Sequence, residues 1–174
     1  MKLTPKIAKF ISDNCKGMYK ENRLQLEELC KKLNLKCLSA EYPKDISGAI
    51  IKDDNSDTCT IYVNKDHAKT RQRFTIAHEI GHYISYLNES FSKEEFEKNK
   101  GFEDNFVYYR KDGSASPAEM EANLIAAELL MPEDRVNTLI KDNFTIEEMA
   151  DIFFVSQAAM TIRIQKLFPH LIGF

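Results

Sequence analysis

The segment from Arg73 to Leu87 constrains the fold of this chain more than any other. It contains His78, Glu79 and His82 as a His-Glu-x-x-His signature, and its apolar residues recur with the period of an α-helix. On a helix, the two histidines lie about one turn apart on the same face, so both imidazoles can bind one ion. Glu79 is displaced around the helix, where its carboxylate can accept a proton from water without binding the ion. The pattern predicts a helix with two zinc ligands and a general base.

The residues around the signature indicate an amphipathic helix. An apolar stripe is expected roughly opposite the histidines, formed by Ile76, Ile80, Tyr83, Ile84 and Leu87. Gly81 is an exception within this pattern, because a glycine inside a helix costs about 1 kcal/mol relative to alanine. We expect the backbone of another element to approach the helix closely at this position.

A second helix is predicted between Ser116 and Pro132. Ser116 can cap its start, Pro117 suits the first helical position, and Pro132 ends it. Glu119 is expected to complete a Ser-x-x-Glu capping box. Small and apolar residues along one face allow this helix to pack closely against a neighbour.

This second helix also offers the third metal ligand. Glu119 and Asn123 are four residues apart and share a face, so one can bind the ion while the other hydrogen-bonds a ligand histidine. We therefore favour Glu119 as the ligand. Two alternatives stay open, since acidic residues are common in first helical turns without binding metal, and Glu121 is a second carboxylate nearby.

Taken together, the blocks Arg73–His82 and Glu119–Pro132 resemble the ImmA/IrrE family of zinc-dependent metallopeptidases. The likeness runs from about Lys44 to Leu167. It implies that His78, His82 and Glu119 bind Zn²⁺ in a thermolysin-like arrangement and that Glu79 is the general base. Members are associated with phages, mobile elements and stress responses, where they inactivate a cognate repressor by proteolysis. The resemblance therefore implies a zinc endopeptidase whose protein partner is a DNA-binding repressor.

The fold class that we expect is α+β, mainly helical and zincin-like, with a small antiparallel sheet beside the metal-binding helix. Helices are predicted over 4–16 and 21–33, and strands over 36–39, 48–51 and 59–64. The last strand is either an edge strand that docks an extended substrate or an ordinary core strand. We expect one metallopeptidase domain over 1–174, with N-terminal helices (1–35), a sheet and zinc-site core (36–132) and a helical tail (133–174).

The tail from Thr145 to Leu167 has the pattern of a helix-turn-helix. Its apolar skeleton is expected to consist of Met149, Ala150, Phe153, Val155, Ala159, Ile162 and Leu167. Phe154 occupies a turn position where such motifs often carry glycine, and the second helix has few cations beyond Arg163 and Lys166. The net charge of −3 gives the chain no global attraction to nucleic acid. Packing or partner recognition is therefore preferred over direct DNA binding.

Between the two metal-site helices, residues 88–117 mix dense charge with phenylalanines, which favours an amphipathic helix that acts as a lid. Tyr108 and Tyr109 are candidate donors to a developing oxyanion. Arg73 is either a clamp for a carboxylate or an ordinary surface charge. His67 is given little weight as a further ligand.

The four cysteines lack metal-binding pair spacing, and no apolar segment is long enough for a signal peptide or a membrane span. These features predict a cytoplasmic protein with reduced thiols that does not associate with membranes. The alternative to an enzyme is a non-catalytic, zinc-containing regulator that binds a repressor partner or DNA.

Overall fold

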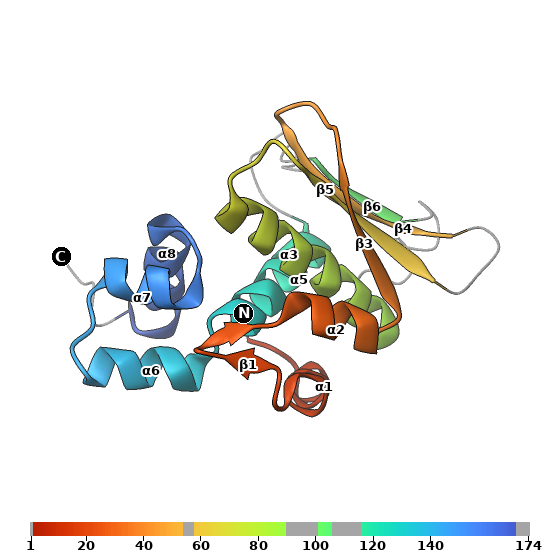
Figure 1. Cartoon of the computed structure of the whole chain (residues 1–174). Helices are drawn as coiled ribbons and strands as arrows, with labels where there is room; N and C mark the ends of the chain where they lie inside the picture. Colours follow the sequence, from red (N-terminus) through yellow and green to blue (C-terminus); the bar gives the residue numbers. More distant parts are fainter. Residues whose placement is uncertain (1, 54–57, 90–100, 106–115, 170–174) are drawn as a thin grey trace.

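The computed structural model describes residues 2–53, 58–89 and 116–169, together with the backbone of 101–105. In Figure 1 a sheet lies against the long helix α3 (Lys69–Leu87), which packs in turn on the long helix α5 (Pro117–Leu130), and shorter helices flank this centre. The buried apolar residues form one cluster that includes members of both long helices, the sheet and both ends of the chain. The predicted fold class, α+β and mainly helical, is confirmed.

The sheet contains β3 (Leu35–Ala40), β5 (Cys59–Asn64), β4 (Ile46–Lys52) and β6 (Gly101–Asn105), in that spatial order. β4 pairs antiparallel with β5 and with β6, whereas β3 pairs parallel with β5. The sheet is therefore mixed, and the prediction of a purely antiparallel sheet is wrong. The reason is the topology of the chain. β4 runs antiparallel to β3 but is separated from it by the space of one strand, and β5 then reverses direction and fills that space, so β5 is parallel to β3.

The alternative in which strand 59–64 is an edge strand that docks an extended substrate is also wrong. β5 lies between β3 and β4 and is paired with a strand on each side. Its backbone groups are thus already used, and an added strand would have no free hydrogen-bonding edge to pair with. The alternative, a core strand, agrees with the burial of Ile61 and Val63.

Helix α3 lies against β4 and β5 on one side and against α5 on another. All of its residues from Ala77 to Ser85 are buried, so the expectation that only one side would be covered is wrong. Contact with the sheet depends on Gly48, because a Cβ there would lie 2.5 Å from the Tyr62 carbonyl oxygen and 2.6 Å from the Thr75 Cγ2 atom. A side chain at this position would force the helix and the sheet apart.

The predicted backbone contact at Gly81 is confirmed. A Cβ at Gly81 would lie 2.7 Å from the carbonyl oxygen of Ala122 and 3.0 Å from its Cα atom. The glycine of α3 and the alanine of α5 therefore let the two helix backbones approach more closely than side chains normally allow. This approach sets the separation between the two helices that carry the metal-site residues.

At the N-terminus, α1 (Pro5–Cys15) is followed by a hairpin of β1 (Tyr19–Lys20) and β2 (Arg23–Leu24) and then by α2 (Leu26–Lys32). The predicted helix 21–33 therefore begins too early. Glu21 and Asn22 adopt φ angles of 48° and 64°, as in the two-residue turns that suit the twist of a hairpin. Asn22 also accepts a hydrogen bond from Arg135 across 2.9 Å, which holds the turn against a distant part of the chain.

The C-terminal region consists of α6 (Glu133–Lys141), α7 (Ile146–Phe153) and α8 (Gln157–Leu167). The predicted helix-turn-helix in the tail is present, and Ser156 caps α8 through the amide of Ala159. Ile162, expected in the apolar skeleton, is instead 51% exposed.

Arg163, one of the two basic residues noted in the second helix of the tail, is not available for contact with DNA. This residue is buried, pairs with Glu128 and donates from Nε to the Met131 carbonyl oxygen across 2.9 Å. Because those carbonyl and carboxylate groups lie at the end of α5, Arg163 attaches the tail to the central helices.

Part of the segment predicted as a lid helix is strand β6. The remainder of the lid, with Tyr108 and Tyr109, lies outside the described residues. In the described part of the chain, no helix combines the length and apolar character needed to cross a bilayer.

Candidate metal centre

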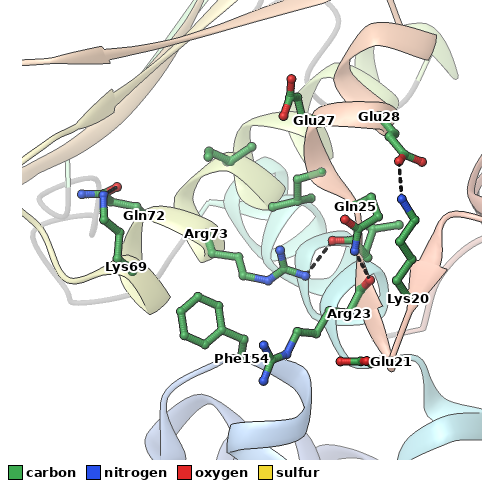
Figure 2. A pocket seen from close by; sticks show the side chains of 13 residues that line it. Lys20, Glu21, Arg23, Gln25, Glu27, Glu28, Lys69, Gln72, Arg73 and Phe154 are labelled. Carbon is green, nitrogen blue, oxygen red and sulfur yellow. Dashed lines mark hydrogen bonds and ion pairs between the residues drawn. The ribbon is translucent and has the colours of Figure 1, made fainter.

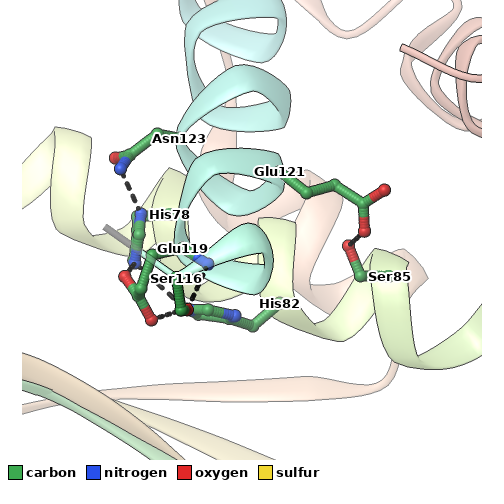
Figure 3. Close-up of polar contacts among 7 residues, drawn as sticks. All are labelled: His78, His82, Ser85, Ser116, Glu119, Glu121 and Asn123. Carbon is green, nitrogen blue, oxygen red and sulfur yellow. Dashed lines mark hydrogen bonds and ion pairs between the residues drawn. The ribbon is translucent and has the colours of Figure 1, made fainter. Parts of the chain in front are cut away.

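The structure brings His78 and His82 of α3 together with Glu119 in the first turn of α5 (Figure 3). The Nε2 atoms of both histidines lie 3.1 Å from the Glu119 carboxylate, each facing a different oxygen. The two Nε2 atoms are also 3.1 Å apart, and the imidazole rings meet edge to face. Three donor atoms therefore converge on one small volume.

These distances suit a single zinc ion. Tetrahedral coordination with bonds of 2.0–2.2 Å requires neighbouring ligand atoms about 3.4 Å apart. The observed separations are close to this value, so a small expansion of the cluster would admit the ion. Two imidazoles and one carboxylate also form the donor set of a zinc site that keeps a further position open.

Asn123 contacts the first of these histidines from the next turn of α5. His78 donates from Nδ1 to the Asn123 side-chain oxygen across 3.1 Å. A donor proton on Nδ1 leaves the Nε2 lone pair free to bind a metal. The hydrogen bond thus selects both the tautomer and the orientation of the His78 ring.

Ser116 begins α5 and thereby positions the carboxylate. Its side chain accepts a hydrogen bond from the Glu119 amide across 3.2 Å, so the serine cap is present. The reciprocal half of the predicted capping box is not observed, since the Glu119 side chain contacts the two histidines instead. The carboxylate of Glu119 is thus directed toward α3 rather than toward the backbone amide of Ser116.

Burial and charge act together in this cluster. Burial alone would raise the pKa of the Glu119 carboxyl, but its hydrogen bonds with His78 and His82 outweigh that effect and hold the pKa well below its usual range. Burial lowers the pKa of His82 despite the hydrogen bond with Glu119. An ionised carboxylate and neutral imidazoles are the forms that bind a divalent cation.

The structure separates Glu121 from this cluster. Glu121 is buried and accepts a hydrogen bond from Ser85 Oγ across 2.5 Å, on the far side of His82 in Figure 3. Among the described residues, the cluster capable of holding a metal contains Glu119 and not Glu121. The Ser85–Glu121 pair was missed from the sequence, although a serine in an otherwise buried helix was an available signal.

Glu79, the predicted base, is completely buried on α3. In the sequence it lies between the two candidate histidine ligands.

The two other residues considered from the sequence lie outside the cluster. Arg73 donates from Nη2 to the Leu24 carbonyl oxygen across 2.8 Å, which joins α3 to the N-terminal hairpin. His67 contacts the Lys44 carbonyl oxygen through Nε2 and does not belong to the cluster.

Comparison with protein families bears on this centre directly. Residues 30–165 match the family model described as the IrrE N-terminal-like domain, peptidase family M78. The chain belongs to this family. The match confirms the resemblance predicted from the sequence and begins earlier than the expected start near Lys44. None of the curated proteins matches the chain.

Membership in the M78 family agrees with the geometry on two points. The family implies a metallopeptidase-like domain with a bound metal, and the structure contains a three-residue cluster suited to one. The matched segment includes both α3 and α5, which carry every member of that cluster.

Proposed function

We propose that this protein is a zinc-dependent endopeptidase. The observation that carries the proposal is the buried convergence of His78, His82 and Glu119 beside Glu79, within a chain of the M78 family. In this proposal the three converging side chains are the zinc ligands. A zinc ion held there would supply Lewis-acid chemistry, acidifying a water molecule and polarising the scissile carbonyl.

The residues around the ligands would keep the site in a productive arrangement. Asn123 holds His78 with its Nε2 atom toward Glu119, so little reorganisation is needed on metal binding. The Ser116 cap fixes the first turn of α5 and hence the backbone of Glu119. Close packing of α3 on α5 at Gly81 fixes the separation of the two helices that carry the ligands.

Glu79 is the proposed general base and acid. Its carboxylate would accept a proton from the attacking water and then deliver this proton to the leaving amide nitrogen. Its position next to His78 places it one helical step, about 100°, around α3 from the first ligand. A carboxylate in that position can serve the reacting water without taking a ligand place.

As substrate we propose a DNA-binding repressor or a related regulatory protein. The support is the resemblance to peptidases that inactivate cognate repressors. In this chain Arg163 is buried against Glu128 and Met131, so the tail loses one of its few cations for contact with phosphate groups. We infer that DNA targeting belongs to the partner, which the reading frame beside this gene is expected to encode.

The proposal is tested with the Glu79→Gln variant, because glutamine has nearly the same shape but cannot accept the proton. We expect about one zinc per chain by elemental analysis, as in the wild type, and a loss of about 10²–10⁴-fold in kcat/KM. The substrate is the neighbouring repressor, cleaved with and without chelator and followed by mass spectrometry of the fragments.

Two outcomes would contradict the assignment. Retained hydrolysis by Glu79→Gln would reject Glu79 as the base. A wild-type protein that binds zinc and the repressor but produces no fragments would favour the non-catalytic regulator instead. The Lys141→Gln variant serves as a matched control for loss of one exposed charge far from α3, and its activity should equal that of the wild type.

A further inference from the structure

A groove of about 630 Å³ lies where the N-terminal hairpin, α2, the start of α3 and the α7–α8 turn meet (Figure 2). Its apolar lining includes Leu24, Ile76 and Phe154. From α3 it takes residues of the first turns only, all preceding His78, so none of the metal-cluster residues lines it. The groove is therefore separate from the candidate metal centre.

Two guanidinium groups project into this region. Arg73 donates to the Leu24 carbonyl oxygen, and Arg23 donates to the carbonyl oxygens of Asp151 and Ile152 across 2.8 and 3.0 Å. Figure 2 shows both side chains near Phe154, and the Arg23 guanidinium lies over the Phe154 ring, 5.2 Å from its centroid. Within the described residues, neither guanidinium forms an ion pair with a carboxylate.

The acidic residues of the groove do not compensate these charges. Glu28 pairs with Lys20 across 2.8 Å, and Glu27 pairs with Lys31 across 2.9 Å. Glu21 lies in the hairpin turn and is exposed to solvent. Burial, together with the nearby charge of Arg23, lowers the pKa of Arg73.

We propose that this groove binds the oxyanion of a small organic molecule, a phosphate or a carboxylate, between Arg23 and Arg73. The planar guanidinium groups retain N–H donors that their carbonyl partners do not use, and such donors match the geometry of both oxyanions. Lys69 lines the same groove and adds a third cation. The volume is in the range of small-molecule sites, and Ile76 and Phe154 provide apolar surface for the rest of the ligand.

Binding would connect distant parts of the chain. Arg23 holds the last carbonyl groups of α7, whereas Arg73 belongs to α3, the helix that carries the metal cluster. An anion between them links the C-terminal helices to α3 through the N-terminal hairpin. Since a ligand that binds only the folded state stabilises it, saturation should raise the melting temperature of the protein.

The proposal is tested by titrating the full chain with inorganic phosphate, pyrophosphate and citrate at constant ionic strength. Binding is followed by calorimetry and by amide chemical shifts. We expect saturable 1:1 binding, with pyrophosphate the tightest if the natural group is a phosphate and citrate the tightest if it is a carboxylate. Chelation of zinc should leave this binding unchanged, because the groove and the metal centre share no residue.

Variants separate a specific site from general attraction. Arg73→Gln should weaken binding about tenfold, the effect of losing a charged hydrogen bond, and Lys69→Gln should weaken it by a smaller factor without affecting the fold. Lys141→Gln removes an exposed charge elsewhere and should bind as the wild type does. Arg73→Lys keeps the positive charge but lacks the planar guanidinium group. This variant provides the test if Arg73→Gln does not fold.

Three results would overturn the proposal. The first is the absence of saturable binding for all three probes. The second is an equal loss of affinity in Lys141→Gln and Lys69→Gln. The third is unchanged affinity in both Lys69→Gln and Arg73→Lys.

Discussion

The two ends of α3 show opposite uses of polar side chains. Towards its C-terminal end the helix packs on α5 with backbone contact at Gly81, and the side chains of His78 and His82 are buried against Glu119. At its N-terminal end the helix borders a groove, where Arg73 donates a hydrogen bond to a carbonyl oxygen of the hairpin. Close packing thus fixes the donor atoms at one end, whereas at the other end partly buried and exposed cations line a groove.

The packed end should be the more sensitive to small changes in volume. In Gly81→Ala, the added methyl group meets the Ala122 backbone, which cannot move as a flexible side chain would. We expect a loss of about 1–3 kcal/mol in the free energy of unfolding from overpacking, against a gain of about 1 kcal/mol from helix propensity. Urea denaturation measures the net loss, and zinc binding should weaken because α3 and α5 move apart.

Met120→Ala is the control for that variant, since Met120 is an exposed residue of α5, and its stability should change little. If Gly81→Ala were as stable as the wild type and bound zinc normally, the backbone contact would not be what positions the ligands.

A smaller effect is expected at Asn123. Asn123→Ala removes the acceptor for His78 Nδ1 and lets the imidazole change its tautomer and orientation. Loss of such an outer hydrogen bond typically lowers metal affinity 10–100-fold. Competition with a chromogenic chelator measures the zinc Kd, and Asn123→Asp, which retains an acceptor, should recover most of the affinity. Equal affinities for all three proteins would show that this hydrogen bond does not orient the ligand.

The smallest effect should come from the open end of α3. Arg73→Gln removes one hydrogen bond to the Leu24 carbonyl oxygen, which should reduce the free energy of unfolding by about 1 kcal/mol. Zinc content should stay at the wild-type level. A loss of zinc in this variant would mean that the two ends of α3 are coupled, in contrast to the separation described above.

The sequence predicted the metal helices well because their signals are local. The spacing of His78 and His82 and the serine cap of α5 depend only on helix geometry and on immediate neighbours. The mixed sheet could not be predicted in this way, since the position of β5 between β3 and β4 is a choice of topology between segments far apart in the chain. Arginine is usually found at the protein surface, and Arg163 is buried because α8 docks on the end of α5. The sequence alone does not reveal this docking.

The capping box at Ser116 shows a related limit. The Ser-x-x-Glu spacing predicts two reciprocal hydrogen bonds, and one of them is present. The other is replaced because the same glutamate can reach two imidazoles of a different helix. Here a tertiary contact between α3 and α5, which the local pattern cannot reveal, determines where the glutamate side chain points.

The most direct test of the account compares zinc content in two matched variants, Glu119→Gln and Glu121→Gln. Both remove one carboxylate charge from the same helix, two residues apart, but only Glu119 lies within the cluster with His78 and His82. After purification with excess zinc and dialysis, we predict about one zinc per chain in the wild type and in Glu121→Gln, and a large loss in Glu119→Gln. Zinc retained by Glu119→Gln and lost by Glu121→Gln would contradict the ligand set.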